Sequence, residues 1–174
     1  MQSRSPSYPL ALGALLCALT VVLAQVVIPI PPVPVSLSLA GVLLCGALLG
    51  GRQGALCMAV YLLMGLCGLP VFAGFSAGPG ALLGPTGGFL VGYIPCAYLC
   101  GALSGRMPDA AAMAVGTAAC YACGTAWYAA SAAAPLQAAL SVCVLPFLPG
   151  DLGKILLAAL LARRLRPALL RVAH

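Results

Sequence analysis

The sequence predicts an all-α integral membrane protein, a compact bundle of six transmembrane helices. Of the 174 residues, 63% are hydrophobic and only 6% are charged, and the mean hydropathy is +1.14. Soluble domains carry about a quarter charged residues. The apolar runs are long enough for helices of about 20 residues, whereas a membrane barrel would show alternating segments of about ten. We therefore expect one six-helix membrane domain over residues 1–174 and no soluble domain.

The first helix is expected at residues 10–28, an apolar run that follows Arg4. The run is longer than the apolar part of a usual signal peptide and further spans follow it, so we interpret it as a membrane helix. Ala14 and Ala18 place small residues four positions apart, a spacing that allows close helix contact. Gln25 is interpreted either as a helix–helix hydrogen bond or as a ligand contact.

A stiff connector is expected next, at residues 29–34. Its four prolines fix φ and remove backbone donors, so no helix can run through it. The second helix then covers residues 35–50 and the third covers residues 54–69, with a short turn at 51–53 between them.

The second outer loop, residues 70–86, is rich in Gly and Pro but has no charged or amide side chain. Non-helical backbone at membrane depth is stable only when protein buries it or when it lines a cavity. We therefore expect this loop to pack back onto the bundle as a lid or re-entrant segment. A P-loop is excluded, because Pro85 follows Gly84 where lysine is required and Pro79 replaces the earlier glycine.

The fourth helix is expected at residues 87–104 and the fifth at residues 110–130. Gly88 and Gly92 lie four positions apart in the fourth helix, so a neighbouring helix can approach closely.

Residues 131–148 form the third outer loop. Within it, residues 136–145 are apolar but too short to span a membrane, and prolines bound them on both sides, so we predict a half-helix or surface helix. The sixth helix covers residues 149–166 and ends in a cluster of arginines.

All the arginines fall on one side of this six-span arrangement, and the outer loops 29–34, 70–86 and 131–148 contain no Lys or Arg. The positive-inside rule assigns the arginine side to the cytoplasm. We therefore expect a multi-pass protein of the bacterial cytoplasmic (inner) membrane with cytoplasmic N- and C-termini. The arginines are Arg4, Arg52, Arg106, Arg163, Arg164, Arg166 and Arg171.

Asp151 and Lys154 are the two charged residues that lie within an apolar run, at the outer end of the sixth helix. Residues i and i+3 face the same side of a helix, and intramembrane charges tend to be partnered and functional. One interpretation is a mutual salt bridge that holds the helix end. The other is a recognition site, in which the carboxylate accepts N–H donors and the ammonium donates to a carbonyl or carboxylate oxygen.

Catalysis and metal binding have little support. Cys120 and Cys123 form one CxxC without a second pair, and the single histidine is His174, so a zinc site lacks ligands. No nucleophile motif or second acid accompanies Asp151, so we expect no catalytic residue, no metal and no cofactor. The basic residues lie at helix ends without an aromatic or polar face, which argues against nucleic acid and leaves membrane lipid as the surrounding partner.

Four segments together resemble the motifs of the BioY family, the biotin-binding S components of energy-coupling factor (ECF) transporters. The specific signal comes from the GPTGG and PFxPGDxxK patterns; Ser38 stands where the family often has Gln, and Phe89 where it often has Tyr. The segments are residues 33–37, 68–74, 83–92 and 146–154.

The resemblance implies an S-component fold that captures biotin from outside and works with a transmembrane T protein and two ABC ATPases, which hydrolyse the ATP. Asp151 and Lys154 match the acid and base that contact biotin, and their chemistry suits its ureido ring. Ala14 and Ala18 are similar to the AxxxA motif that docks on the T protein. The other substrate-binding residues it implies are Ser36, Phe72, Phe75, Leu83, Gly84, Thr86 and Tyr93.

Other functions stay open. The chain is alternatively an S component for another small vitamin, because ligands differ on a shared fold. A small membrane enzyme and a homo-oligomeric channel are the alternatives from other classes.

Overall fold

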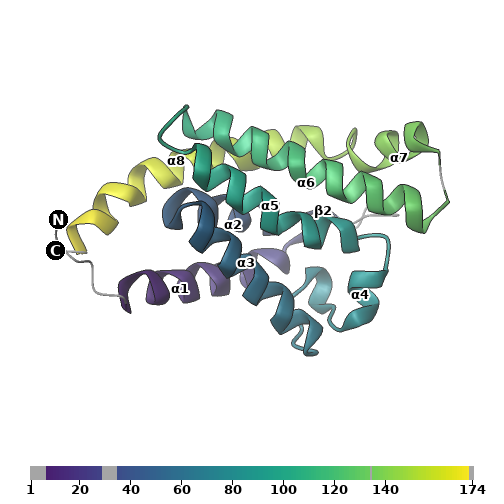
Figure 1. Cartoon of the computed structure of the whole chain (residues 1–174), viewed down its shortest axis with the longest axis horizontal. Coiled ribbons are helices and arrows are strands. Elements are labelled where there is room, and N and C mark those ends of the chain that lie inside the picture. Colours follow the sequence, from purple (N-terminus) through teal and green to yellow (C-terminus); the bar gives the residue numbers. More distant parts are fainter. Residues whose placement is uncertain (1–6, 29–34, 134, 173–174) are drawn as a thin grey trace.

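The computed structural model describes residues 7–28, 35–133 and 135–172, and within them six long helices form a bundle (Figure 1). Helix α2 lies at its centre: every residue from Ser38 to Ala47 is buried, and α1, α3, α5 and α8 all contact it. The all-α bundle is as predicted. The six long helices are α1 (Ser7–Ala24), α2 (Ser38–Leu49), α3 (Gly51–Leu66), α5 (Gly87–Leu103), α6 (Asp109–Ser131) and α8 (Leu148–Val172).

The first helix ends at Ala24, so the predicted extent to residue 28 was wrong. Val27–Ile28 (β1) instead pairs antiparallel with Val35–Ser36 (β2). β-Branched residues favour extended backbone, and so does the position before a proline, which Ile28 occupies. The second helix consequently starts at Ser38 rather than at 35. The predicted connector at residues 29–34 lies outside the described residues.

The turn between the second and third helices is tighter than predicted. Gly50 alone makes it, with φ of 84°, a left-handed conformation that glycine adopts without steric cost. Helix α3 therefore begins at Gly51, and the expected turn at 51–53 is helical.

Both later outer loops contain short helices. The loop at 70–86 holds the 3-10 helix η1 (Ala73–Phe75) and α4 (Pro79–Leu83), and the loop at 131–148 holds α7 (Leu136–Cys143), which confirms the short helix predicted there. The last helix continues through Pro167 to Val172 instead of ending at 166, since good helix formers follow this proline.

Close packing of α5 on α6 follows from the glycines of α5, as predicted. A Cβ added at Gly88 would lie 2.7 Å from the carbonyl oxygen of Cys123, and one at Gly92 would lie 3.2 Å from the Cα of Cys120. Any larger residue would push the helices apart, and α6 carries a wall of the cavity described below.

A charged contact joins three helices at the end of the bundle opposite Asp151. One Nη of Arg166 donates to Asp109 Oδ1 at 3.1 Å and to the carbonyl oxygen of Ala47 at 3.1 Å. Asp109, the first residue of α6, is only 7% exposed. The contact joins α8 to the start of α6 and the end of α2, so the position of α8 along its axis is fixed at the end opposite Asp151.

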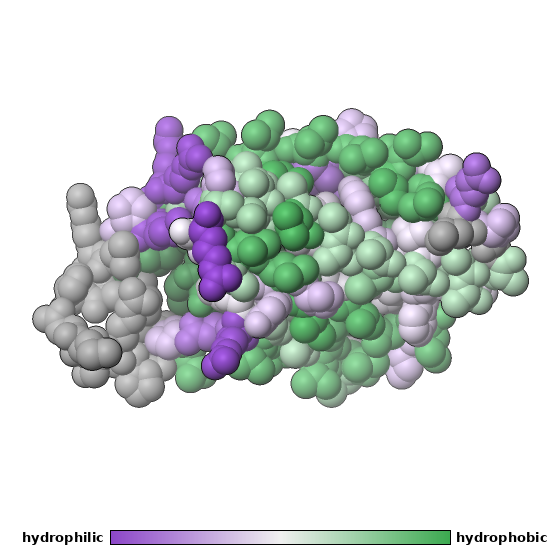
Figure 2. Space-filling model, turned by 45° about the horizontal axis from the view of Figure 1, so that its top comes forward, coloured by the Kyte–Doolittle hydropathy of each residue, from purple (hydrophilic) through white to green (hydrophobic). Residues whose placement is uncertain are grey.

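Much of the surface is apolar, and strongly hydrophilic side chains gather mostly toward one end (Figure 2). Leu152, Leu156 and Leu160 of α8 form an outward stripe and are 58%, 60% and 60% exposed. An apolar surface of this kind marks contact with membrane or protein.

Among the described residues no single helix has both the length and the hydropathy of a membrane span. The bent pair Gln137–Cys143 and Leu148–Leu169, with an angle of 51° between its halves, meets both conditions together.

Candidate functional site

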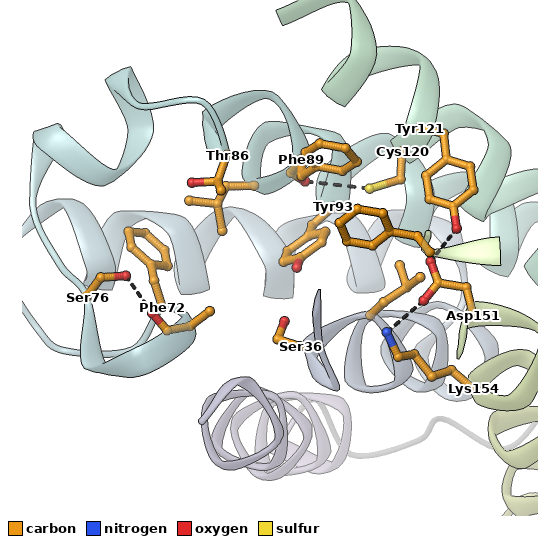
Figure 3. A pocket seen from close by; sticks show the side chains of 14 residues that line it. Ser36, Phe72, Ser76, Thr86, Phe89, Tyr93, Cys120, Tyr121, Asp151 and Lys154 are labelled. Atoms are coloured by element: carbon orange, nitrogen blue, oxygen red, sulfur yellow. Dashed lines mark hydrogen bonds and ion pairs between the residues drawn. The ribbon is translucent and has the colours of Figure 1, made fainter. Parts of the chain in front are cut away.

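A cavity of about 110 Å³ lies at the end of the bundle where α8 begins (Figure 3). Its walls come from β2 and α2, from the loop before α5, and from α5, α6 and α8, so segments far apart in the sequence meet there. The lining residues are Ser36, Leu39, Phe72, Ala73, Ser76, Thr86, Phe89, Leu90, Tyr93, Cys120, Tyr121, Phe147, Asp151 and Lys154.

Asp151 and Lys154 form the charged part of this cavity. Asp151 lies in the first turn of α8, and Lys154 Nζ donates to Asp151 Oδ1 at 2.6 Å. The residues are 3% and 7% exposed, respectively. Taking two charges out of water costs several kcal/mol per ion, which their attraction offsets only with good geometry and further hydrogen bonds. The predicted salt bridge is therefore present, and the same pair also faces the cavity.

Tyr121 supplies the further hydrogen bond. Its hydroxyl donates from α6 to Asp151 Oδ2 at 2.5 Å, so each carboxylate oxygen has one donor from the protein. Sequence reasoning missed this residue, because thirty positions separate Tyr121 from Asp151 and no motif contains both. The one available signal was that Tyr121, a phenol with no assigned role, lies in the helix that packs on the glycines of α5.

A chain of three hydroxyl groups connects two residues of the cavity wall. Ser36 Oγ lies 2.6 Å from Ser38 Oγ, and Ser38 Oγ lies 2.5 Å from the hydroxyl of Tyr93. Ser38 is buried, so the chain satisfies a polar group that would be costly to leave unpaired. Ser36 and Tyr93 are the members that line the cavity.

Aromatic rings form much of the remaining wall. Phe89 of α5 stacks on Phe147, with ring centroids 5.9 Å apart and planes inclined by 19°. Phe72 is 1% exposed and meets Tyr61 edge to face at 5.7 Å. Flat apolar surfaces beside a small set of polar groups are typical of small-molecule sites.

The structure brings six of the nine predicted substrate-binding residues to this cavity and leaves three outside it. Ser36, Phe72, Thr86, Tyr93, Asp151 and Lys154 line it, whereas Phe75, Leu83 and Gly84 do not.

The three outliers have physical reasons. Phe75 and Leu83 point outward and are 69% and 71% exposed, and the carbonyl oxygen of Gly84 accepts a hydrogen bond from Trp127 Nε1 at 3.0 Å. The ring of Phe72 already fills the inward position, packed so closely on Gly65 that an added Cβ there would overlap it. Phe75, Leu83 and Gly84 therefore do not line this cavity, and their role in binding substrate stays a prediction.

The loop over the cavity packs back onto the bundle, as predicted, and Gln25 holds it. Gln25 Oε1 accepts from the backbone N–H of Phe75 at 2.8 Å, and Gln25 Nε2 donates to the carbonyl oxygen of Phe72 at 3.4 Å. This side chain thus joins α1 to both ends of the turn that directs Phe72 inward. Neither sequence interpretation of Gln25 included a contact to this loop.

Ala14 and Ala18 lie elsewhere, on the exposed side of α1. Ala14 borders a second, apolar groove of about 410 Å³ between α1 and α3, which Gly13, Cys17, Leu56 and Val60 also line. The groove is distinct from the cavity around Asp151.

The chain is similar to a known family and to named relatives over most of its length. The model of the BioY family matches residues 1–171. The chain is 38% identical to the biotin transporter BioY of Thermotoga maritima, covering 86% of this chain and 90% of that protein. It is 36% identical to a probable biotin transporter BioY of Pyrococcus horikoshii, covering 90% and 94%.

The fold is similar to a solved structure as well. A crystal structure of the S component for biotin from an ECF-type ABC transporter superposes with a TM-score of 0.89 at 28% identity, covering 96% of this chain and 95% of that chain. The predicted S-component-like fold is confirmed.

Proposed function

This chain belongs to the BioY family, and from that premise we propose that it is a membrane protein that binds biotin as the S component of an ECF-type ABC transporter. It is not an enzyme. The observation that carries the proposal is the buried Asp151–Lys154 pair, which faces a cavity with aromatic walls.

The chemistry of the pair suits a cyclic urea. A ureido ring offers two N–H donors beside one carbonyl acceptor, and the pair offers a carboxylate beside an ammonium. We assign the ring N–H groups to Asp151 and the ring carbonyl oxygen to Lys154, because charge-assisted hydrogen bonds in a buried site are stronger than neutral ones. The apolar ring that is fused to the ureido ring then lies against Phe89 and Phe147.

We further propose which partners the chain has and how it is oriented in the membrane. A transmembrane T protein docks on the side of α1 that presents Ala14 and Ala18, and two ABC ATPases supply the energy. The chain crosses the cytoplasmic membrane several times with both termini in the cytoplasm, supported by the arginines near the chain's ends and in its alternate turns. Biotin then enters from outside, at the end where Asp151 lies.

A competition experiment tests the ligand. Labelled biotin is bound to the purified chain in detergent, and unlabelled biotin, thiamine, riboflavin and folate are added as competitors. We expect displacement by biotin alone. Displacement by another vitamin at lower concentration would favour the alternative of an S component for that vitamin.

A further inference from the structure

The cavity differs in polarity and exposure between its two ends (Figure 3). Asp151 and Lys154 form the charged end and are buried. Ser76 and Thr86 lie at the other end and carry only hydroxyl groups; Ser76 is exposed and Thr86 is half-buried. A ligand that places its head on the charged pair therefore has its tail near neutral groups and water.

Among the residues that the structure describes, the cavity offers no unpaired cationic side chain to the tail of such a ligand. Lys154 is the one lysine of the sequence, and its ammonium is 2.6 Å from Asp151, so the pair is neutral as a unit. Residues 29–34 contain no charged residue in the sequence.

The described arginines belong to the opposite end of the bundle. Arg163 follows Lys154 by nine positions on α8, about 14 Å along the helix axis. Arg166 is already held by Asp109 and the carbonyl oxygen of Ala47.

The free-energy cost of burying an unpaired charge indicates where the tail carboxylate of biotin lies. Burying it beside a neutral pair would leave an unpaired charge, which is strongly unfavourable. At the exposed end, water and the hydroxyls of Ser76 and Thr86 can solvate it. A charge that keeps its water contributes little to affinity.

We propose that the site recognises the ureido head of its ligand through charge and does not recognise the charge of the tail, so that neutral amides and esters of the biotin carboxyl group are ligands as well. This inference rests on the proposed function and extends its substrate class to carboxyl-modified biotin derivatives.

The test changes the ligand and leaves the protein unaltered, so folding cannot confuse the result. Dissociation constants of the purified wild-type chain are measured for biotin and for biotinamide, in which a neutral amide replaces the carboxylate. We expect the two constants to agree within about fivefold, the most that a solvated charge contributes. A loss for biotinamide greater than about tenfold would overturn the inference, and absence of binding by both ligands would overturn the proposed function with it.

A variant separates the two possible partners of Lys154. If Lys154 contacts the head, Lys154→Met weakens biotin and biotinamide by the same factor. If its ammonium instead holds the tail carboxylate, the variant weakens biotin and spares biotinamide, and the inference is overturned. Circular dichroism and elution as a single species check that the variant folds; if it does not, the wild-type comparison decides alone.

Discussion

Asp151 is held by two donors, the Lys154 ammonium on one oxygen and the Tyr121 hydroxyl on the other. A carboxylate offers about four lone-pair positions, so two remain for the N–H groups of a ligand. The internal hydrogen bonds therefore fix the direction of the group without exhausting its capacity. Preorganisation of this kind lowers the entropy lost on binding.

Removing either charge should abolish most of the affinity for biotin. Asp151→Asn and Lys154→Met each remove one charge-assisted contact and leave the partner charge buried, so we expect a loss of at least about thirtyfold in each. Isothermal titration in detergent measures it. Ser141→Ala, on the exposed side of α7, is the matched control and should bind as the wild type does. Unchanged affinity in both site variants would refute the site.

Tyr121→Phe should weaken binding by about tenfold, because the hydrogen bond that orients Asp151 is lost while the ring stays. The loss should be equal for biotin and biotinamide, since Tyr121 acts through the head group. Tyr98→Phe is the control, as Tyr98 is 46% exposed on α5 and does not line the cavity. Equal affinities for Tyr121→Phe and the wild type would show that Asp151 needs no second donor.

At the scale of elements, the cavity depends on the loop between α3 and α5 and on its attachment to α1 through Gln25. Two hydrogen bonds from one amide fix the turn that carries Phe72. The contacts that hold a loop set the free energy of its local opening, so this attachment contributes to how tightly the cavity is covered.

Gln25→Met should therefore speed biotin dissociation by severalfold, since each lost hydrogen bond is worth about 1 kcal/mol. Stopped-flow displacement of a labelled ligand measures the rate. Gln137→Met, an exposed glutamine on α7, should leave the rate unchanged. A dissociation rate of Gln25→Met equal to that of the wild type would mean that the loop is held by other contacts.

The helices and the charged pair could be predicted from the sequence because their signals are local. Apolar runs, the Gly88–Gly92 spacing and the i,i+3 spacing of Asp151 and Lys154 each lie within a few turns of one helix. Tyr121 could not be found this way, because its contact with Asp151 depends on how α6 and α8 pack. The outward turn of Phe75 likewise depends on Gln25, fifty positions away.

At the scale of the whole molecule, the cavity around Asp151 and the exposed alanines of α1 lie on different parts of the bundle. Binding and partner docking should therefore separate in mutants. Asp109 and Arg166 join α2, α6 and α8 at the end opposite Asp151, and together with the α5–α6 packing they hold the walls of the cavity in place.

Ala14→Leu and Ala18→Leu should leave biotin affinity within about twofold of the wild type, as exposed substitutions usually have small effects, but should reduce biotin uptake by cells. Uptake of radiolabelled biotin and titration of the purified variants measure the two properties. Ala114→Leu, the same change at an exposed residue of α6, is the comparison and should alter neither property. Loss of binding in the alanine variants would mean that this side of α1 supports the fold instead.

The central claim is that the buried pair binds the ureido ring, and a structure of the chain with biotin bound tests it most directly. We expect the ring N–H groups within about 3 Å of the Asp151 carboxylate and the ring oxygen within about 3 Å of Lys154 Nζ. The tail should point toward Ser76 and Thr86. A complex in which the carboxylate of biotin contacts Lys154, or in which the ureido ring lies away from Asp151, would contradict the account.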